Sequence, residues 1–344
     1  MGPLSFSRMR NNAVMDAPAL LARDGERQSR CSAWSAYWST GSLHSCATSF
    51  KGDYAGAIGD FWRQVFSSLP VDARVLDLAT GNGPLPRLLR KQRGWQDWVE
   101  AVDLAEIQPR WHDADRDPRL RFHPGVSLEM LPFADHSFDL VVSQYGFEYA
   151  VRERALAEIN RVCSRSGSLA LVVHHAGSVL AEVAHAEVAH HDWLLSSDGL
   201  LVAAREIVPF LGVARRDARA LKDNSEAFVA RERYNTVANA VQGRIASALA
   251  PDVLVQSLGW VHAQLGKVTA SNSEEILEQI NSFGLALEQA RTRSRELTAC
   301  ALDDVALALL VEELGCLRPG ACIEVGELRQ SEGILGWWLR LKPA

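Results

Sequence analysis

Two glycines and two acids lie at the ends of two apolar segments of the chain. Gly81 and Gly83 follow the run VLDLAT, which contains Asp77, and Asp103 ends the run WVEAVD. Glycine lets the backbone turn tightly and approach a ligand without a Cβ in the way. An acid at the tip of the second strand can accept hydrogen bonds from both hydroxyls of a ribose. These residues therefore predict a nucleoside site.

The helix start that follows the glycines is unusual for a phosphate site. Where a dinucleotide fingerprint has its third glycine the chain has Pro86, and Pro84 lies two residues earlier. A pyrophosphate uses the free N–H groups at a helix start, and proline has none. The turn suits a ligand that needs close approach but brings no phosphates. Together with Asp77 and Asp103, this favours a positively charged nucleoside over NAD.

Residues able to act on a second molecule follow two other apolar runs. His174 and His175 end the run SLALVVHH, and histidine titrates near neutral pH as a general base should. Tyr145 is a further catalytic candidate, and we expect Glu148 and Tyr149 to line an acceptor pocket with it. Plain packing would also explain these residues: one histidine under a lid, the other bonded to a loop, and the tyrosines between a strand and a helix.

Strand and helix signals alternate through the middle of the chain. We predict strands at 74–80, 97–104, 120–125, 138–145 and 168–175, helices at 85–94 and 154–167, and a terminal strand pair within 320–344. Alternation of this kind indicates parallel strands joined by crossovers, and continuous apolar runs indicate that both faces are covered. The expected fold is α/β, a Rossmann-like, doubly wound, seven-stranded sheet that is mostly parallel, with the last strand antiparallel.

The remaining segments suggest five parts. We expect a mobile tail at 1–30, an N-terminal helical cap at 31–70, the core at 71–176, a helical insertion at 177–294 and a final helix with a β-hairpin at 295–344. The insertion is predicted to be a lid, because an acceptor must be shielded from water by apolar walls. Trp34, Tyr37 and Trp38 of the cap fit that need, although packing on the sheet would explain them equally well.

The order of these motifs resembles a known family. VLDLATGNG resembles motif I of the class I S-adenosylmethionine-dependent methyltransferases, and VEAVDL resembles their second motif. LEMLPFADHSFDLVVSQYGFEY is similar to the third and fourth motifs, and ALAEINRVCSRSGSLALVVHH to the segment that ends in the fifth strand. The likeness runs from about Arg74 to His175. It is closest to the group named after the ubiquinone and menaquinone C-methylases (methyltransferase type 11).

The resemblance implies S-adenosylmethionine as cofactor and S-adenosylhomocysteine as product. The family often has an acid after strand three for the adenine amino group, and this chain has Ser127 and Leu128 there. The residues implied to bind the cofactor are Asp77, Ala79, Thr80, Gly81, Asn82, Gly83, Asp103, Leu104, Ser127, Leu128, Ser143 and Gln144.

The expected function is methyl transfer to a small acceptor that is largely apolar or aromatic. The sequence does not tell whether the methylated atom is an oxygen, a nitrogen or a carbon. Two alternatives remain: a protein that uses the bound cofactor without methyl transfer, and a non-catalytic partner subunit. The net charge of −6 and the segment SQYGFEY after strand four, where amino-methylating relatives carry N/D-P-P-Y/F, argue against nucleic acid.

Two further kinds of site are not expected. No apolar run is long enough to span a bilayer, so we expect a cytoplasmic protein without a membrane partner. The pairs Glu182/His185 and Glu187/His190 lie five residues apart, about 140° around one helix, so they do not converge on a metal. The sequence leaves homodimerisation open.

Overall fold

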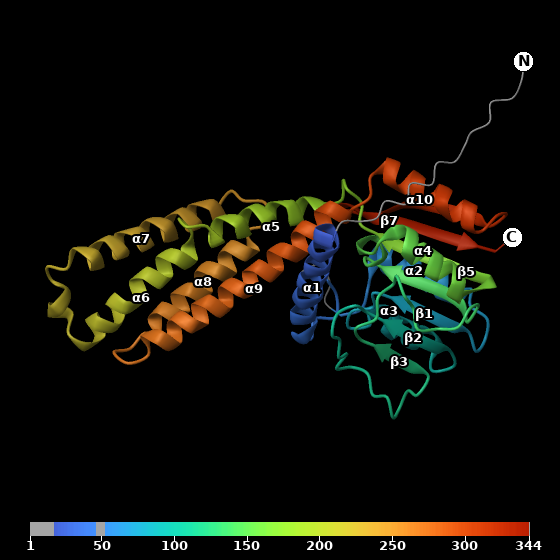
Figure 1. The fold of residues 1–344 in the computed structure, drawn as a ribbon, viewed down its shortest axis with the longest axis horizontal. Helices are drawn as coiled ribbons and strands as arrows, with labels where there is room; N and C mark the ends of the chain where they lie inside the picture. The colour runs from blue at the N-terminus through green and yellow to red at the C-terminus, as the bar shows by residue number, and fades with distance from the viewer. Residues whose placement is uncertain (1–16, 46–51, 344) are drawn as a thin grey trace, which may run out of the picture.

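The computed structural model describes residues 17–45 and 52–343 of the chain. Within them seven strands form one sheet, in the order β3-β2-β1-β4-β5-β7-β6 (Figure 1). The strands are β1 (Arg74–Leu78), β2 (Trp98–Val102), β3 (Leu120–His123), β4 (Phe138–Gln144), β5 (Cys163–Val173), β6 (Cys322–Gln330) and β7 (Gly333–Lys342). The helices are α1 (Ala17–Ser39), α2 (Gly56–Ser67), α3 (Pro84–Arg93), α4 (Arg152–Val162), α5 (Val179–Leu195), α6 (Leu200–Arg216), α7 (Ser225–Ile245), α8 (Asp252–Gly266), α9 (Ser273–Cys300) and α10 (Asp304–Leu317), with 3-10 turns η1 (Phe147–Tyr149) and η2 (Ala218–Leu221).

The strand directions confirm the predicted Rossmann-like fold. β1 is parallel to β2 and β4, β2 to β3, and β4 to β5. β7, the last strand in the chain, runs antiparallel to both of its neighbours, β5 and β6. From β1 the chain adds β2 and β3 on one side of the sheet, and it then returns to add β4 and β5 on the other side, so the order of addition reverses between β1 and β4. Ligands of such sheets bind beyond the carboxyl ends of the strands at this reversal, so the fold itself indicates where a site should lie.

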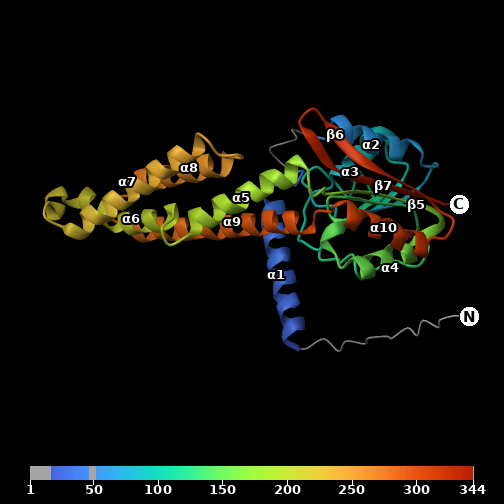
Figure 2. The same ribbon diagram turned by 90° about the horizontal axis from the view of Figure 1, so that it is seen from above.

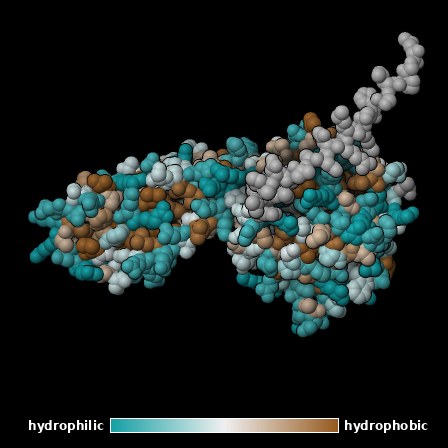
Figure 3. Space-filling view, viewed as in Figure 1, coloured by the Kyte–Doolittle hydropathy of each residue, from teal (hydrophilic) through white to brown (hydrophobic). Residues whose placement is uncertain are grey.

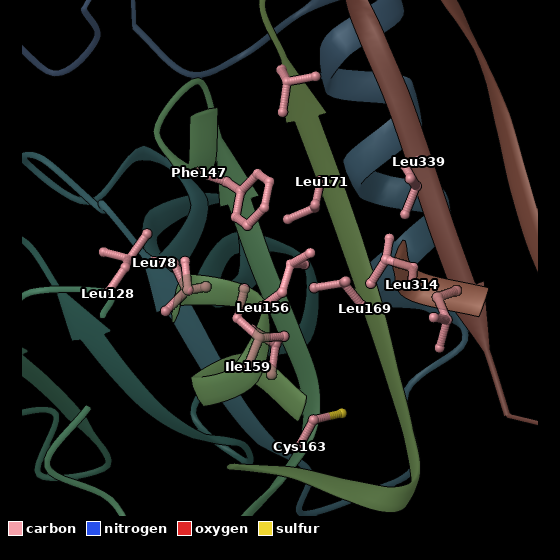
Figure 4. Packing of buried hydrophobic residues seen from close by; sticks show 14 of the residues in the cluster. Leu78, Leu128, Phe147, Leu156, Ile159, Cys163, Leu169, Leu171, Leu314 and Leu339 are labelled. Carbon is pink, nitrogen blue, oxygen red and sulfur yellow. The ribbon is translucent and has the colours of Figure 1, made fainter. Parts of the chain in front are cut away.

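Helices cover both faces of the sheet, as the continuous apolar strands require. On one face α2 and α3 pack through residues such as Trp62 and Leu89. On the other, α4 and α10 pack through Ile159 and Leu314 (Figure 4). The strands that carry the glycine turn and Asp103 are therefore held rigidly from both sides.

One helix ends earlier than predicted. The expected helix at 154–167 stops at Val162, and β5 begins at once with Cys163, which pairs with Phe138 of β4. The register between these strands then shifts, so Ser168 pairs with Leu140. Pairing with β4 takes the segment 163–167 out of the helix, a tertiary effect that local propensity does not contain.

The prediction of a mobile tail at 1–30 is wrong for residues 17–30, which are helical. Residues 1–16 lie outside the described residues, but α1 begins at Ala17 and continues without a break into the predicted cap. The segment is rich in polar and charged residues, so its composition resembled that of a tail. It is helical here in contact with loops of the sheet and with α9, described below, and packing of that kind overrides a weak local signal.

The insertion predicted at 177–294 forms a helical arm, which we define as α5 to α9 (residues 179–300). The arm extends sideways from the sheet and has an apolar core of its own (Figures 1 and 2). Figure 3 shows it as a separate lobe of the surface. It leaves and rejoins the sheet at one point, because His175 and Leu302 form a parallel β-bridge. Within the described residues, no arm side chain lines the cavity described below, and the lid stays a prediction.

Candidate functional site

A cavity of about 420 Å³ lies at the carboxyl ends of β1, β2 and β4, where the fold predicts a ligand. It has the size of a small-molecule site. α1 forms one wall, and the loops that follow β1 to β4 form the other. The lining residues are Arg27, Arg30, Cys31, Trp34, Trp38, Ser45, Tyr54, Ala79, Thr80, Pro84, Asp103, Leu104, Ala105, Ser127, Leu128, Glu129, Gln144, Tyr145, Gly146, Tyr149, Ala150, Val151 and Arg154.

The glycine turn is shaped by close contacts. Gly81 has a φ of 54°, a left-handed conformation that favours glycine. A Cβ at this position would lie 2.5 Å from the Trp38 indole. The Gly81 N–H donates a hydrogen bond to Oδ2 of Asp103 over 2.8 Å. The turn after β1 and the acid after β2 therefore form one unit.

Two buried carboxyl groups lie beneath this turn. Asp103 accepts from the N–H groups of Gly81 and Ala105, each over 2.8 Å, and burial raises its pKa to about 6. Asp77 accepts from the Thr80 hydroxyl over 2.5 Å. Burial, with a smaller contribution from the negative charge of Asp103, raises the pKa of Asp77 to about 8. Among the described residues, Oδ1 of Asp77 has no hydrogen-bond partner. A positively charged nucleoside would fit both groups.

Two residues at neighbouring strand ends have strained backbones that the sequence did not reveal. Ala79, after β1, has a φ of 53°, and Tyr145, after β4, has a φ of 55°. A Cβ on Gly146 would lie 2.3 Å from that of Ala79, so the two strand ends are in close contact. Non-glycine residues in this conformation cost of order 1–3 kcal/mol each and gather at functional sites.

Many of the predicted site residues reach the cavity wall. They are Trp34, Trp38, Ala79, Thr80, Asp103, Leu104, Ser127, Leu128, Gln144, Tyr145 and Tyr149. Asn82 and Ser143 lie behind the wall and support it. The Asn82 amide donates to the carbonyls of Trp38 and Ser42, and the Ser143 hydroxyl donates to the carbonyl of Leu78.

Gly83 does not face the cavity as expected. A Cβ on Gly83 would lie 2.7 Å from the Phe122 ring and 3.0 Å from the Trp111 ring. Its φ of 75° and its place before Pro84 let the backbone enter α3 under these two rings. The need for glycine here comes from packing of the start of α3 against Phe122 of β3 and Trp111 of the loop before it.

The histidines expected in catalysis lie behind the wall. His174 is buried, its Nδ1 lies 2.7 Å from Oε1 of Glu148, and its ring stacks on Tyr145 with centroids 4.2 Å apart. Glu148, predicted in the acceptor pocket, is buried in this pair and accepts the His174 N–H as well. His175 stacks on Trp337 at 4.3 Å. Both rings are held by these partners, and neither histidine lines the cavity.

Tyr37 also lies outside the cavity wall, because its hydroxyl donates to the carbonyl of His44 over 2.6 Å. Conversely, Arg27, Arg30, Tyr54, Glu129 and Arg154 line the cavity without having been predicted. Arg27 and Arg30 continue the spacing of Trp34 and Trp38 along one face of α1, a signal hidden by the assignment of a tail. Glu129 follows Ser127 and Leu128 and offers the acid that was missed after strand three.

The second Glu-x-x-His pair of the arm has structural contacts. Glu187 accepts from the Ser294 hydroxyl over 3.0 Å, and His190 donates to the carbonyl of Leu249 over 3.0 Å. In the described ranges, no group of three His, Cys, Asp or Glu side chains is placed to hold a metal ion. Within residues 17–45 and 52–343, no helix combines the length and the apolar character that crossing a membrane requires.

Comparison with known proteins agrees with this geometry. Residues 76–171 match the methyltransferase domain family. The chain is 34% identical over 118 residues to a demethylmenaquinone methyltransferase of Thermus thermophilus, covering 32% of this chain and 53% of that one. It is 33% identical over 101 residues to a ubiquinone/menaquinone biosynthesis C-methyltransferase of Legionella pneumophila, covering 28% and 40%. The chain spans about half the length of the curated relatives it matches.

Solved structures are also similar over part of the chain. A 1,6-didemethyltoxoflavin-N1-methyltransferase of Burkholderia thailandensis, with its substrate and S-adenosylhomocysteine bound, is 20% identical, with a TM-score of 0.35 and coverage of 48% of this chain and 67% of that one. A SAM-dependent methyltransferase of Aquifex aeolicus is 21% identical, with a TM-score of 0.31 and coverage of 35% and 65%.

Fold, glycine turn and family match together define the class: residues 76–171 form a class I S-adenosylmethionine-dependent methyltransferase domain. Within that class the domain is similar to the demethylmenaquinone and ubiquinone/menaquinone C-methyltransferases named above.

Proposed function

We propose that the whole chain is an S-adenosylmethionine-dependent methyltransferase whose acceptor is a small molecule, largely apolar or aromatic. The observation that carries this proposal is the cavity itself. Asp103, Thr80 and Gln144 of its wall come from the ends of three neighbouring strands, and the aromatic side chains of α1 lie opposite. The strand ends proposed to bind the cofactor and an aromatic surface thus share one cavity.

The residues that would hold the cofactor are those of the strand ends. Asp103 has free lone pairs for the ribose hydroxyls beyond its two bonds to backbone N–H groups. Leu104 would pack on the adenine, with Ser127, Leu128 and Glu129 beside it. Asp77 and Gln144 would lie near the methionine part, and the unpartnered Oδ1 of Asp77 suits a cationic group.

The acceptor would lie against the aromatic part of the wall. Trp34 and Trp38 stack with centroids 5.6 Å apart, and Tyr149 meets Trp34 edge to face at 6.1 Å. Such walls bury an apolar ring while leaving few polar groups unsatisfied. The buried part of this wall would also exclude water from the acceptor.

Bound S-adenosylmethionine supplies a methyl group that is already activated as part of a sulfonium. The protein's own task is to hold an acceptor in line with it, and orientation alone can lower a barrier by several kcal/mol. In the described part of the chain, no histidine lines the cavity. The Tyr145 hydroxyl donates to the carbonyl of Leu335 over 2.9 Å, which holds the ring in place. We therefore assign Tyr145 a positioning role and His174 the task of supporting it.

A binding assay tests the cofactor. S-adenosylhomocysteine should raise the melting temperature of the protein, because a ligand that binds only the folded state stabilises it. NAD and NADP are the matched controls and should leave it unchanged. A shift with NAD and none with S-adenosylhomocysteine would refute the proposal.

An activity assay tests methyl transfer. The protein is incubated with a metabolite extract and cofactor labelled in the methyl group, and label in a product is measured together with S-adenosylhomocysteine. Labelled product supports a methyltransferase. Cofactor binding with neither labelled product nor S-adenosylhomocysteine would indicate a protein that uses the cofactor without methyl transfer, or a non-catalytic subunit.

A further inference from the structure

We propose that the helical arm acts as a strut that holds α1 in place as a wall of the cavity, and that Arg293 and Glu296 of α9 are the positioning residues. The inference rests on the proposed function in one respect, that the cavity binds the cofactor. It gives the arm a role at the site although the arm points away from it.

α1 lies across the cavity along much of its length. Its lining residues are Arg27, Arg30, Cys31, Trp34 and Trp38. They recur every three or four positions and so share one face of the helix, over about 16 Å at 1.5 Å per residue. One helix face thus extends along one whole side of the cavity.

α1 touches the loops that carry the cofactor residues. The Cys31 thiol lies 3.4 Å from the carbonyl of Leu104, and the Ser35 hydroxyl accepts from the N–H of Glu106 over 2.9 Å. The Asn82 amide donates to the carbonyl of Trp38 over 2.9 Å. A displacement of α1 would therefore change the strand-end loops as well as the opposite wall.

The apolar support of α1 on the sheet side is small. Its cluster there consists of Trp38, Ala105 and Ile107 as buried members, with a few partly buried side chains around them. By comparison, α2 contributes Ile58, Phe61, Trp62, Val65 and Phe66 to the main core. A helix with so little buried apolar area needs further contacts to stay in one position.

α9 supplies those contacts on the other side of α1. The Arg293 guanidinium donates to the carbonyl of Ala33 over 3.1 Å and lies over the Tyr37 ring at 4.7 Å. Arg30 and Glu296 form an ion pair with 2.5 Å between Nε and Oε1. Arg30 also donates to the carbonyl of Tyr149 over 2.6 Å. One side chain of α1 thus links the arm to the cavity wall.

α9 is in turn held by α5. The Ser294 hydroxyl donates to Glu187, and Asp192 pairs with both Arg291 and Arg295. These side chains of α9 alternate with Arg293 and Glu296, which face α1. The base of the arm is therefore a two-helix unit with one face on α1, and its placement fixes that of α1.

The experiment compares Arg293→Ala with Arg295→Ala in the full chain. Both remove an arginine from the same helix, but among the described residues the side chain of Arg295 pairs within the arm, with Asp192. We measure two quantities: the dissociation constant of S-adenosylhomocysteine by calorimetry, and the rate at which trypsin cuts after Arg27 and Arg30. Arg293→Ala should weaken binding about tenfold, as loss of one charge-assisted hydrogen bond predicts, and should speed cleavage in α1. Arg295→Ala should change both much less, because Asp192 still pairs with Arg291.

A charge exchange supplies a rescue. Arg30→Glu and Glu296→Arg should each speed cleavage after Arg27. The double variant should be cut more slowly than either single variant, because the ion pair forms again with reversed signs, although the bond from Arg30 to the Tyr149 carbonyl stays lost. If Arg293→Ala fails to fold, Arg293→Lys and this exchange provide the same comparison.

Two results would overturn the strut: equal effects of Arg293→Ala and Arg295→Ala on both measurements, or no restoration in the double variant. A wild-type protein that binds no S-adenosylhomocysteine would instead overturn the proposed function. Cleavage in α1 still tests the strut in that case, because it does not depend on the ligand.

Discussion

Asp77 and Asp103 are two carboxyl groups buried next to each other under the glycine turn. Burial opposes the ionised form of both groups and raises the pKa of Asp103 to about 6. Burial, with a smaller contribution from the charge of Asp103, raises the pKa of Asp77 to about 8. A cationic ligand reverses this effect, since it favours the ionised form. Near pH 7 these residues are therefore poised to couple cofactor binding to proton release.

We predict that S-adenosylmethionine binds more tightly as the pH rises from 6 to 8 and releases protons on binding. Without ligand, the folded state holds the proton of Asp77 more tightly than the unfolded chain does, since the pKa is raised from 3.8 to about 8. This contribution to stability is fully present below pH 3.8 and is lost as the pH rises through about 8. Calorimetry in buffers of different ionisation enthalpy measures the proton release. Asp77→Asn is the control and should remove most of it, whereas unchanged proton release in Asp77→Asn would contradict this assignment.

Asp103→Ala should weaken cofactor binding about tenfold to a hundredfold, because charge-assisted hydrogen bonds of roughly 1.5–3 kcal/mol are lost. Asp103 also accepts from the Gly81 and Ala105 backbones, so the melting temperature should fall slightly. Asp113→Ala is the matched control, since Asp113 is half-exposed and pairs with the exposed Arg116. Wild-type affinity in Asp103→Ala, measured by calorimetry, would show that the acid has no part in binding.

At the scale of residues, strand-end positions could be predicted and side-chain directions could not. Asp103 and Thr80 follow apolar strands, so their place at the sheet edge follows from the pattern alone. His174 also ends a strand, yet its ring pairs with Glu148 behind Tyr145. Which side a terminal residue takes depends on strand twist and on partners distant in sequence, and these carry no local signal.

At the scale of elements, α1 and the glycine turn form a matched pair of surfaces. The Trp38 indole lies on Gly81, whose missing Cβ makes room for it. The sequence predicted both residues in the site but assigned Trp38 to the acceptor alone. The contact places Trp38 against the cofactor turn as well, so we now expect its loss to affect both ligands.

Gly81→Ala should displace Trp38 and lower cofactor affinity, because the added Cβ would lie 2.5 Å from the indole. Trp38→Ala removes that clash, so the double variant should bind the cofactor better than additivity of the two single changes predicts. The φ of 54° at position 81 leaves some strain in either background. Calorimetry on the four proteins measures the coupling. Strict additivity would indicate that the indole does not lie on the turn in solution.

The N-terminal half of α1 shows why an element can be missed. Arg27 and Arg30 lie in a polar segment in which helical periodicity is weak, and the partners that order it, Tyr149 and Glu296, lie far along the chain. The helices of the arm were predicted from their own apolar stripes. Those stripes pack against each other rather than on the sheet, and no periodicity within one helix indicates which surface it will meet.

At the scale of the whole molecule, the arm and the sheet have separate cores. The two clusters that cover the sheet contain residues of α2, α3, α4 and α10, and from the described arm residues only Leu180 packs against them. The arm begins and ends beside the bridge between His175 and Leu302. Its removal would therefore leave the chain ends close enough to join.

We predict that replacing residues 179–300 by a short Gly-Ser linker leaves the sheet folded but releases α1. The sheet keeps its main clusters, so circular dichroism should report a cooperative thermal transition. Without Arg293 and Glu296, α1 should be cut rapidly by trypsin, and affinity for S-adenosylhomocysteine should fall at least as far as in Arg293→Ala. The residues of the strand ends remain, so weak binding should persist, and Asp103→Ala in the shortened chain should abolish it. Wild-type affinity in the shortened chain would mean that α1 holds its position without the arm, and the arm would then need a function unrelated to the cavity.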